Sequence, residues 1–195
     1  MLDLETLSTR GHASIVVIAA LKFNRESPSV SLSKMNSFYA KVCCDETLGL
    51  HVDPETVSWW RRQDPELQTE VFGTPREPLK EALLRFSTWY GNSSAIWSQG
   101  ANFDIPILSE AYSRCGLQPP WRFWTARDTR TLYELAGISS KDLPTGNLHH
   151  ALHDCWRQVW GVQRACSLLA TSTSKPNKTP SSYYSVPKRI QNIPV

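Results

Sequence analysis

The order of the apolar segments predicts an α/β fold with one main domain. Two strand patterns come first, in the β-branched run 14–23 and in "FYAKV" at 38–42, and short strands then alternate with helices. This order is typical of an α/β sandwich around a mixed sheet. A chain of 195 residues with 41% apolar and 20% charged residues suits one soluble domain with a sizeable core.

The first third of the chain predicts mainly strands, followed by one helix. The runs 14–23 and 38–42 are expected to pair as a hairpin across the polar connection between them. Asp53 followed by Pro54 has the pattern of an N-cap with proline in the first helical position, which predicts a helix over 54–63.

The middle third predicts two helices around a short strand. Thr74, Pro75 and Glu77 form a capping-box pattern, so a second helix is expected to follow. Its apolar face is Leu79, Ala82, Leu83, Phe86 and Tyr90. "SAIWSQ" at 94–99 is expected to be a strand. Asp104 is then expected to cap a helix that ends at Gly116. The apolar stripe of this helix is Ile107, Leu108, Ala111, Tyr112 and Cys115.

The last third predicts two more helices and a tail. One helix should begin at about Asp128, which looks like its N-cap. The final helix carries a stripe with steps of three and four residues, made of Ala151, Cys155, Val159, Val162, Cys166 and Leu169. Residues 171–195 are rich in Ser, Thr, Pro and Lys and are expected to form a flexible tail, which leaves 1–170 as the domain.

Charge and cysteine content narrow the cellular setting. A net charge of +3 allows a polyanionic partner without demanding one. The five cysteines have no CxxC spacing and predict neither a disulfide framework nor a thiolate zinc site, so a cytoplasmic location fits best. The most apolar run, 13–21, is too short to span a bilayer and is not preceded by a basic segment, so we expect no membrane anchor and no signal peptide.

Four acidic residues are candidates for a site, although each has a structural alternative. Asp3 and Glu5 would project from one face of a strand, where a divalent metal would relieve their repulsion, but taken alone the pair is better explained as a frayed acidic terminus. Asp104 could simply cap its helix. Asp154 lies beside the apolar stripe of the last helix and could pair with a surface cation.

Taken together, these residues resemble a known set of motifs. "DLET" at 3–6, "NFD" at 102–104 and "HHALHD" at 149–154 stand in the order of the three motifs of the DEDDh, or DnaQ-like, 3′-to-5′ exonucleases. The chain looks most like the small bacterial and prophage exonuclease VIII-like branch, which is related to a mycobacterial exoribonuclease. The resemblance implies a ribonuclease H-like fold, in which helices flank a mixed five-stranded sheet.

The resemblance also implies roles for particular residues. Asp3, Glu5, Asp104 and Asp154 would be ligands for two Mg²⁺ or Mn²⁺ ions, and His149 would be the general base. Hard oxygen ligands suit these cations, and histidine titrates near neutrality. The expected substrate contacts are Thr6, Leu7, Asn102, Phe103 and Trp60. Adjacent helical residues point about 100° apart, so at most one of Trp59 and Trp60 could face a base, and core packing is the alternative for either.

The predicted function is metal-dependent 3′-to-5′ hydrolysis of single-stranded nucleic acid or 3′ overhangs, with release of nucleoside monophosphates. A zinc hydrolase using His149 and His153 is a weaker alternative, because His150 stands where such a motif needs its glutamate. A nucleic-acid-binding module on the same fold is a third hypothesis, which the intact acidic set argues against. The sequence leaves the choice of RNA or DNA open, and the oligomeric state too, a homodimer included.

Overall fold

The computed structural model of the chain describes residues 1–27, 31–100, 102–145 and 150–173. Within these ranges the strands are β1 (Leu2–Thr6), β2 (Ile15–Lys22), β3 (Asn36–Lys41), β4 (Ile96–Ser98) and β5 (Ala126–Asp128). The α-helices are α1 (Pro54–Arg61), α2 (Pro65–Phe72), α3 (Leu79–Tyr90), α4 (Asp104–Arg114), α5 (Thr129–Ala136) and α6 (Ala151–Thr173). The predicted α/β class is therefore confirmed.

The first three strands form an antiparallel sheet in the order β1-β2-β3. In the β2–β3 ladder Ile18 pairs with Ala40 and Ala20 with Phe38, which confirms the predicted hairpin. The other two strands, β4 and β5, form a separate parallel pair in which Ile96 lies opposite Ala126.

The single five-stranded sheet that the resemblance implies is not formed by the described residues, whose strands fall into a three-stranded and a two-stranded sheet. β1 and β4 lie against each other without a shared ladder. One reason is visible at Leu4, whose backbone N–H donates to the side-chain Oδ1 of Asp104 at 3.1 Å instead of to a strand. The β4 and β5 segments also span only three residues each.

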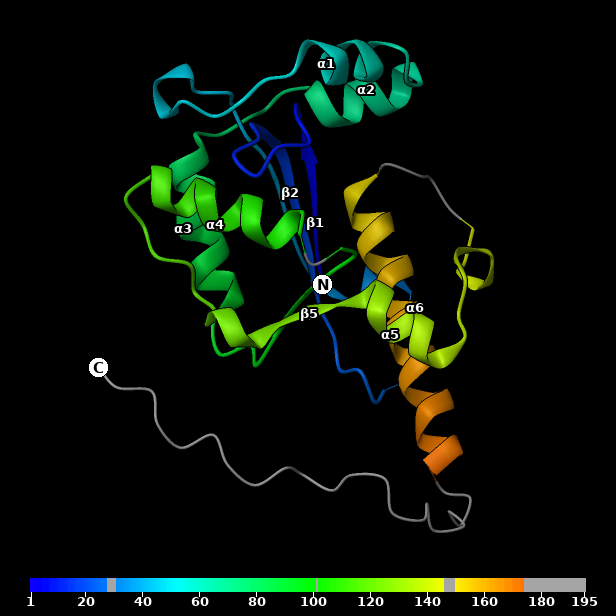
Figure 1. Cartoon of the computed structure of the whole chain (residues 1–195). Helices are drawn as coiled ribbons and strands as arrows, with labels where there is room; N and C mark the ends of the chain where they lie inside the picture. Colours follow the sequence, from blue (N-terminus) through cyan, green and yellow to red (C-terminus); the bar gives the residue numbers. More distant parts are fainter. Residues whose placement is uncertain (28–30, 101, 146–149, 174–195) are drawn as a thin grey trace, which may run out of the picture.

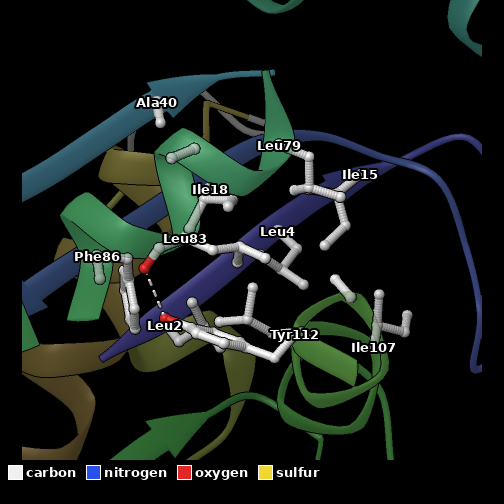
Figure 2. Packing of buried hydrophobic residues seen from close by; sticks show 14 of the residues in the cluster. Leu2, Leu4, Ile15, Ile18, Ala40, Leu79, Leu83, Phe86, Ile107 and Tyr112 are labelled. Carbon is white, nitrogen blue, oxygen red and sulfur yellow. Dashed lines mark hydrogen bonds between the residues drawn. The ribbon is translucent and has the colours of Figure 1, made fainter. Parts of the chain in front are cut away.

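Helices cover both faces of the antiparallel sheet. α3 and α4 lie on one side of β1 and β2, and α5 and α6 lie on the other (Figure 1). On the first side, Leu2 and Leu4 pack against apolar side chains of α3 and α4, as Figure 2 shows. The Tyr112 hydroxyl donates a hydrogen bond of 2.9 Å to the Leu83 carbonyl, which ties these two helices together. The predicted apolar stripe of α4 is buried throughout.

The second face of the sheet carries α6. Its N-terminal stripe of Ala151, Cys155, Val159 and Val162 is buried as predicted, in a core shared with Val17 and Ala19 of β2. Farther along the stripe, Cys166 and Leu169 are only partly buried. The helix continues to Thr173, three residues past the predicted domain boundary at 170. The proposed flexible tail otherwise lies outside the described residues.

Two of the predicted helix starts are confirmed. Asp53 caps α1, because its carboxylate accepts a hydrogen bond from the backbone N–H of Glu55 at 3.2 Å. Asp128 caps α5 by accepting from the backbone N–H groups of Arg130 and Thr131.

The predicted capping box at Thr74 is wrong. α3 begins only at Leu79, with Pro78 at the N-cap position. Glu77 extends the sheet instead: its N–H donates to the carbonyl of Lys41, and its carbonyl accepts from the N–H of Cys43, both at 2.9 Å. The sequence analysis also missed α2, which Asp64 and Pro65 begin in the same way that Asp53 and Pro54 begin α1.

No helix in the described ranges is both long enough and apolar enough to cross a membrane.

Candidate metal centre

β1 places two carboxylates on one face of the sheet. Side chains alternate along a strand, and Leu2 and Leu4 belong to the core beneath α3 and α4. Asp3 and Glu5 therefore project toward the opposite face, on which α6 packs. The interpretation of this pair as a frayed acidic terminus is excluded, since both residues lie inside a paired strand.

α6 brings a third carboxylate to the same place. Ala151 and Cys155 are buried against the sheet, and Asp154 stands one position before Cys155 in the first turn. Asp3, Glu5 and Asp154 each offer an oxygen within 4.8 Å of the oxygens of the other two. We call these three residues the carboxylate cluster. Residues near the start of the chain and in its last helix thus form one acidic group.

Asp104 is buried beside the cluster, and its side chain accepts a hydrogen bond from the backbone of β1. It is the first residue of α4 and only 4% exposed, and its Oδ1 accepts the hydrogen bond from Leu4 described above. The expected N-cap role is a wrong prediction, because Phe103 occupies the N-cap position. Asp104 instead joins the start of α4 to the strand that carries Asp3 and Glu5.

Burial and mutual repulsion raise the pKa values of acids at this site. Burial, reinforced by Asp104, Glu5 and Asp154, raises the pKa of Asp3 well above its ordinary value. Burial and the charges of Asp154 and Asp104 raise the pKa of Glu5 to about 9. Burial likewise raises the pKa of Asp104 to about 7. Buried like charges must be relieved either by protons or by a bound cation.

The donor set of this site fits a hard divalent cation. Among the residues that the structure describes, the converging side-chain ligands are carboxylate oxygens, which Mg²⁺ and Mn²⁺ prefer, whereas zinc favours histidine and cysteine. The three oxygens within 4.8 Å of one another are close enough to share one ion. Asp104 is not one of the residues whose oxygens converge within this distance, and its Oδ1 accepts from the Leu4 amide.

Two residues of α6 that the sequence analysis did not single out support the cluster. The Gln158 side chain donates from Nε2 to Oδ1 of Asp3 at 2.9 Å, and its own Oε1 is buried without a partner. Arg157 donates to Oδ1 of Asp154 at 3.1 Å and to the carbonyl of Pro144 at 2.7 Å. The available signal was their spacing, since residues three and four positions after Asp154 lie on its helix face.

The histidines of the "HHALHD" motif are only partly described. The predicted general base, His149, lies outside the described residues, so the pairing of His149 with His153 lies outside them too. The ring centroids of His150 and His153 are 5.0 Å apart, and burial lowers the pKa of His153. His150 also stacks on Tyr39 of β3.

The predicted substrate contacts fall into two groups. Near β1, Leu7 and Trp60 line a cavity of about 540 Å³ between α1 and α2. Trp60 is only 3% exposed, and its Nε1 donates to the Thr6 carbonyl at 2.9 Å. It is therefore largely a core residue, which agrees with the core-packing alternative and not with the expected contact to a base.

Thr6 is buried as well, and its hydroxyl donates to the Ser8 carbonyl at 2.7 Å. At the start of α4, Asn102 is exposed and Phe103 is partly buried.

Comparison with known families gives one match. A family model described as the 3′-5′ exoribonuclease Rv2179c-like domain matches residues 1–166. The matched range contains β1, α4 and the first turns of α6, and hence every residue of the acidic site. A search of curated proteins found no match.

Proposed function

We propose a specific reaction for this chain, which belongs to the 3′-5′ exoribonuclease Rv2179c-like family and is a hydrolytic 3′-5′ exonuclease. It removes nucleoside monophosphates from the 3′ end of single-stranded nucleic acid or of a 3′ overhang. Two Mg²⁺ or Mn²⁺ ions would assist the reaction. The observation that carries the metal proposal is the carboxylate cluster, with Asp104 buried beside it.

We infer that Asp3, Glu5, Asp104 and Asp154 would together hold the ions. Divalent ions in such a site increase the acidity of a water molecule and stabilise the attacking and leaving oxygens. The Gln158 side chain donates a hydrogen bond to Asp3, and the Arg157 side chain donates one to Asp154. These bonds orient two carboxylates that would otherwise turn away from each other.

His149 is proposed as the general base that takes the proton of the attacking water. In the sequence it stands two positions before the first residue of α6 and five positions before Asp154. An imidazole titrates close to neutral pH and can accept that proton and release it to solvent. The terminal base would lie against Leu7, where the cavity wall is mostly apolar.

We also propose the finer family assignment, which is DEDDh with a ribonuclease H-like arrangement of the strands. Its support is the order of the acids along the chain and the sheet order β1-β2-β3, with β4 against β1 and β5 paired with β4. The zinc alternative has less support, because the described ligand atoms that converge are carboxylate oxygens.

A direct test compares matched RNA and DNA single strands, 3′-overhang duplexes and a circular single strand. With Mg²⁺ or Mn²⁺ we expect a ladder that shortens from the 3′ end and yields monophosphates, whereas the circle and a 3′-phosphorylated strand should resist. Cleavage of the circle would show an endonuclease. Binding without any cleavage would favour the nucleic-acid-binding module.

A further inference from the structure

A second cavity, of about 570 Å³, lies where β1 and β4 begin and β2 ends. This volume is typical of ligand-binding pockets, which span roughly 300–1,000 Å³. Its walls include three cations, Lys22, Arg25 and Arg127, and the aromatic rings of Trp89 and Trp97. No carboxylate belongs to the part of the wall that the structure describes. The charge of this cavity therefore complements an anion.

Two of the three cations lie next to aromatic rings, whereas Arg25 pairs with the exposed carboxylate of Glu26 at 3.6 Å. The Lys22 ammonium lies 5.2 Å from the centre of the Trp89 ring. Arg127 lies opposite Trp97 in the β4–β5 ladder, so both side chains leave the sheet on the same face. Alternating cations and aromatic rings form the usual surface for single-stranded nucleic acid, in which phosphates and bases are bound separately.

An exposed aromatic pair continues this surface beyond the cavity. Phe123 is 84% exposed and Trp124 is 57% exposed, with ring centroids 5.0 Å apart. The Arg122 guanidinium lies 5.3 Å from the Trp124 ring. Arg127 joins the pair to the cavity, because its Nη1 donates to the Trp124 carbonyl at 2.8 Å. Exposed aromatic rings with cations beside them are suited to stacking on bases.

This surface is close to the proposed metal centre. Met1 and Leu2 line the cavity, and Asp3 follows them in β1. Leu2 and Glu5 are three strand residues apart, which corresponds to about 10 Å. Trp97 and Met1 also pack in the same core as α6, on the face that carries Asp3 and Glu5. A strand of a few nucleotides would span this separation.

We propose that the cavity and the Phe123–Trp124 pair together bind single-stranded RNA 5′ of the nucleotide being removed. We call them the basic-aromatic surface, defined by Lys22, Arg25, Trp89, Trp97, Phe123, Trp124 and Arg127. The proposal rests on the proposed function, since it places the 3′ end at the carboxylate cluster. It deepens that function by predicting a preference for longer strands over very short ones.

The test compares a single-stranded RNA of about twelve nucleotides, within the roughly 4–16 nucleotides that such surfaces cover, with a trinucleotide. The dissociation constant of the long strand is measured in EDTA at several salt concentrations, and hydrolysis of the trinucleotide is measured with Mg²⁺. Two variants are used, Trp124→Ala and Arg127→Glu. Their matched controls are Leu84→Ala, an exposed apolar residue of α3, and Lys80→Glu, which lies near Asp45 and Glu46 in another cavity.

We expect Trp124→Ala to weaken binding of the long RNA by about fivefold or more, the loss of one stacked base. Arg127→Glu should weaken it too and reduce the slope of its salt dependence by about one. Both variants should hydrolyse the trinucleotide at nearly the wild-type rate, and both controls should behave like wild type.

Unchanged affinity for the long RNA in both variants would overturn the proposal, and so would an equal loss of trinucleotide hydrolysis. Loss of self-association with unchanged RNA affinity would show instead that two copies of the chain meet at this surface. Failure of the proposed function has a different result: the wild type would hydrolyse neither RNA, although the binding differences would remain.

Discussion

At the scale of single residues, the positions of the acidic side chains distinguish the proposed metal ligands from the residues that cap helices. Asp154→Asn should abolish metal-dependent hydrolysis with little change in the thermal stability of the metal-free protein, because the substitution removes one charge from a cluster of like charges but also the charge that pairs with Arg157. Activity and melting temperature are measured on the same preparation. Asp128→Asn is the matched control, since Asp128 caps α5 outside the cluster. It should remain active and lose no more than about 1 kcal/mol of stability. Full activity of Asp154→Asn would contradict the assignment.

The three histidines of the motif should differ in importance. His149→Ala should lower the turnover rate by about 10²- to 10⁴-fold, which is the usual contribution of a general base. It should also remove the rise in rate through neutral pH while leaving metal binding intact. His150→Ala and His153→Ala should remain within a few-fold of wild type. Equal losses at 149 and 153, together with loss of bound metal, would support the zinc hydrolase instead.

Residue types and spacing predicted the cluster but not all of its support. The alternation of a strand was enough to place Asp3 and Glu5 side by side, and the helical stripe placed Asp154 at its edge. The hydrogen bond from Leu4 to Asp104 could not be predicted, because it joins positions 100 residues apart and replaces a local cap. The contact of Gln158 with Asp3 depends in the same way on how α6 crosses β1.

At the scale of elements, α6 is expected to position a ligand as well as supply one. Gln158→Leu removes the amide that donates to Asp3 and also removes the buried Oε1 that has no partner. We expect the Mg²⁺ concentration for half-maximal activity to rise by about 10- to 100-fold, as with other residues that orient metal ligands, with little loss of stability. Gln163→Ala is the control, because Gln163 of the same helix donates to the carbonyl of Asn24 at the surface. An unchanged Mg²⁺ dependence of Gln158→Leu would contradict this role.

Local signals predicted elements well where no distant partner competed for them. Asp53 and Asp128 begin helices as their sequences suggest. The Thr74–Glu77 pattern failed because the backbone of Glu77 pairs with Lys41 and Cys43 at the end of the antiparallel sheet. This pairing depends on where β3 ends in space, which a local pattern does not contain.

At the scale of the whole molecule, the layers explain why a buried acidic site is tolerated. β2 is buried over almost its whole length between two cores, and β1 is fixed to it along the strand. This packing holds Asp3 and Glu5 in place although their charges repel each other. Repulsion between these buried carboxylates therefore lowers the stability of the metal-free fold, and a bound cation would relieve it.

This repulsion predicts how stability depends on pH and metal. The pKa of Glu5 is about 9 in the folded metal-free protein against an ordinary 4.5, and that of Asp104 is about 7 against 3.8. A raised carboxyl pKa stabilises the folded state at low pH, and this stabilisation is lost as the pH rises toward 9. The buried Met1 amine, whose pKa is lowered to about 6, has the opposite effect between pH 6 and 8.

Comparison with Asp154→Asn therefore isolates the acidic site, because both proteins contain the Met1 amine. In EDTA, the melting temperature of the wild type should fall relative to that of the variant between pH 6 and 9. Each 1 kcal/mol corresponds to about 2–4 °C for a protein of this size. Mg²⁺ should raise the melting temperature of the wild type more at pH 9 than at pH 6, since protons compete with the ion for the same oxygens. Parallel pH profiles of the two proteins, with equal effects of Mg²⁺ at both pH values, would show that the four acids do not act as one metal site.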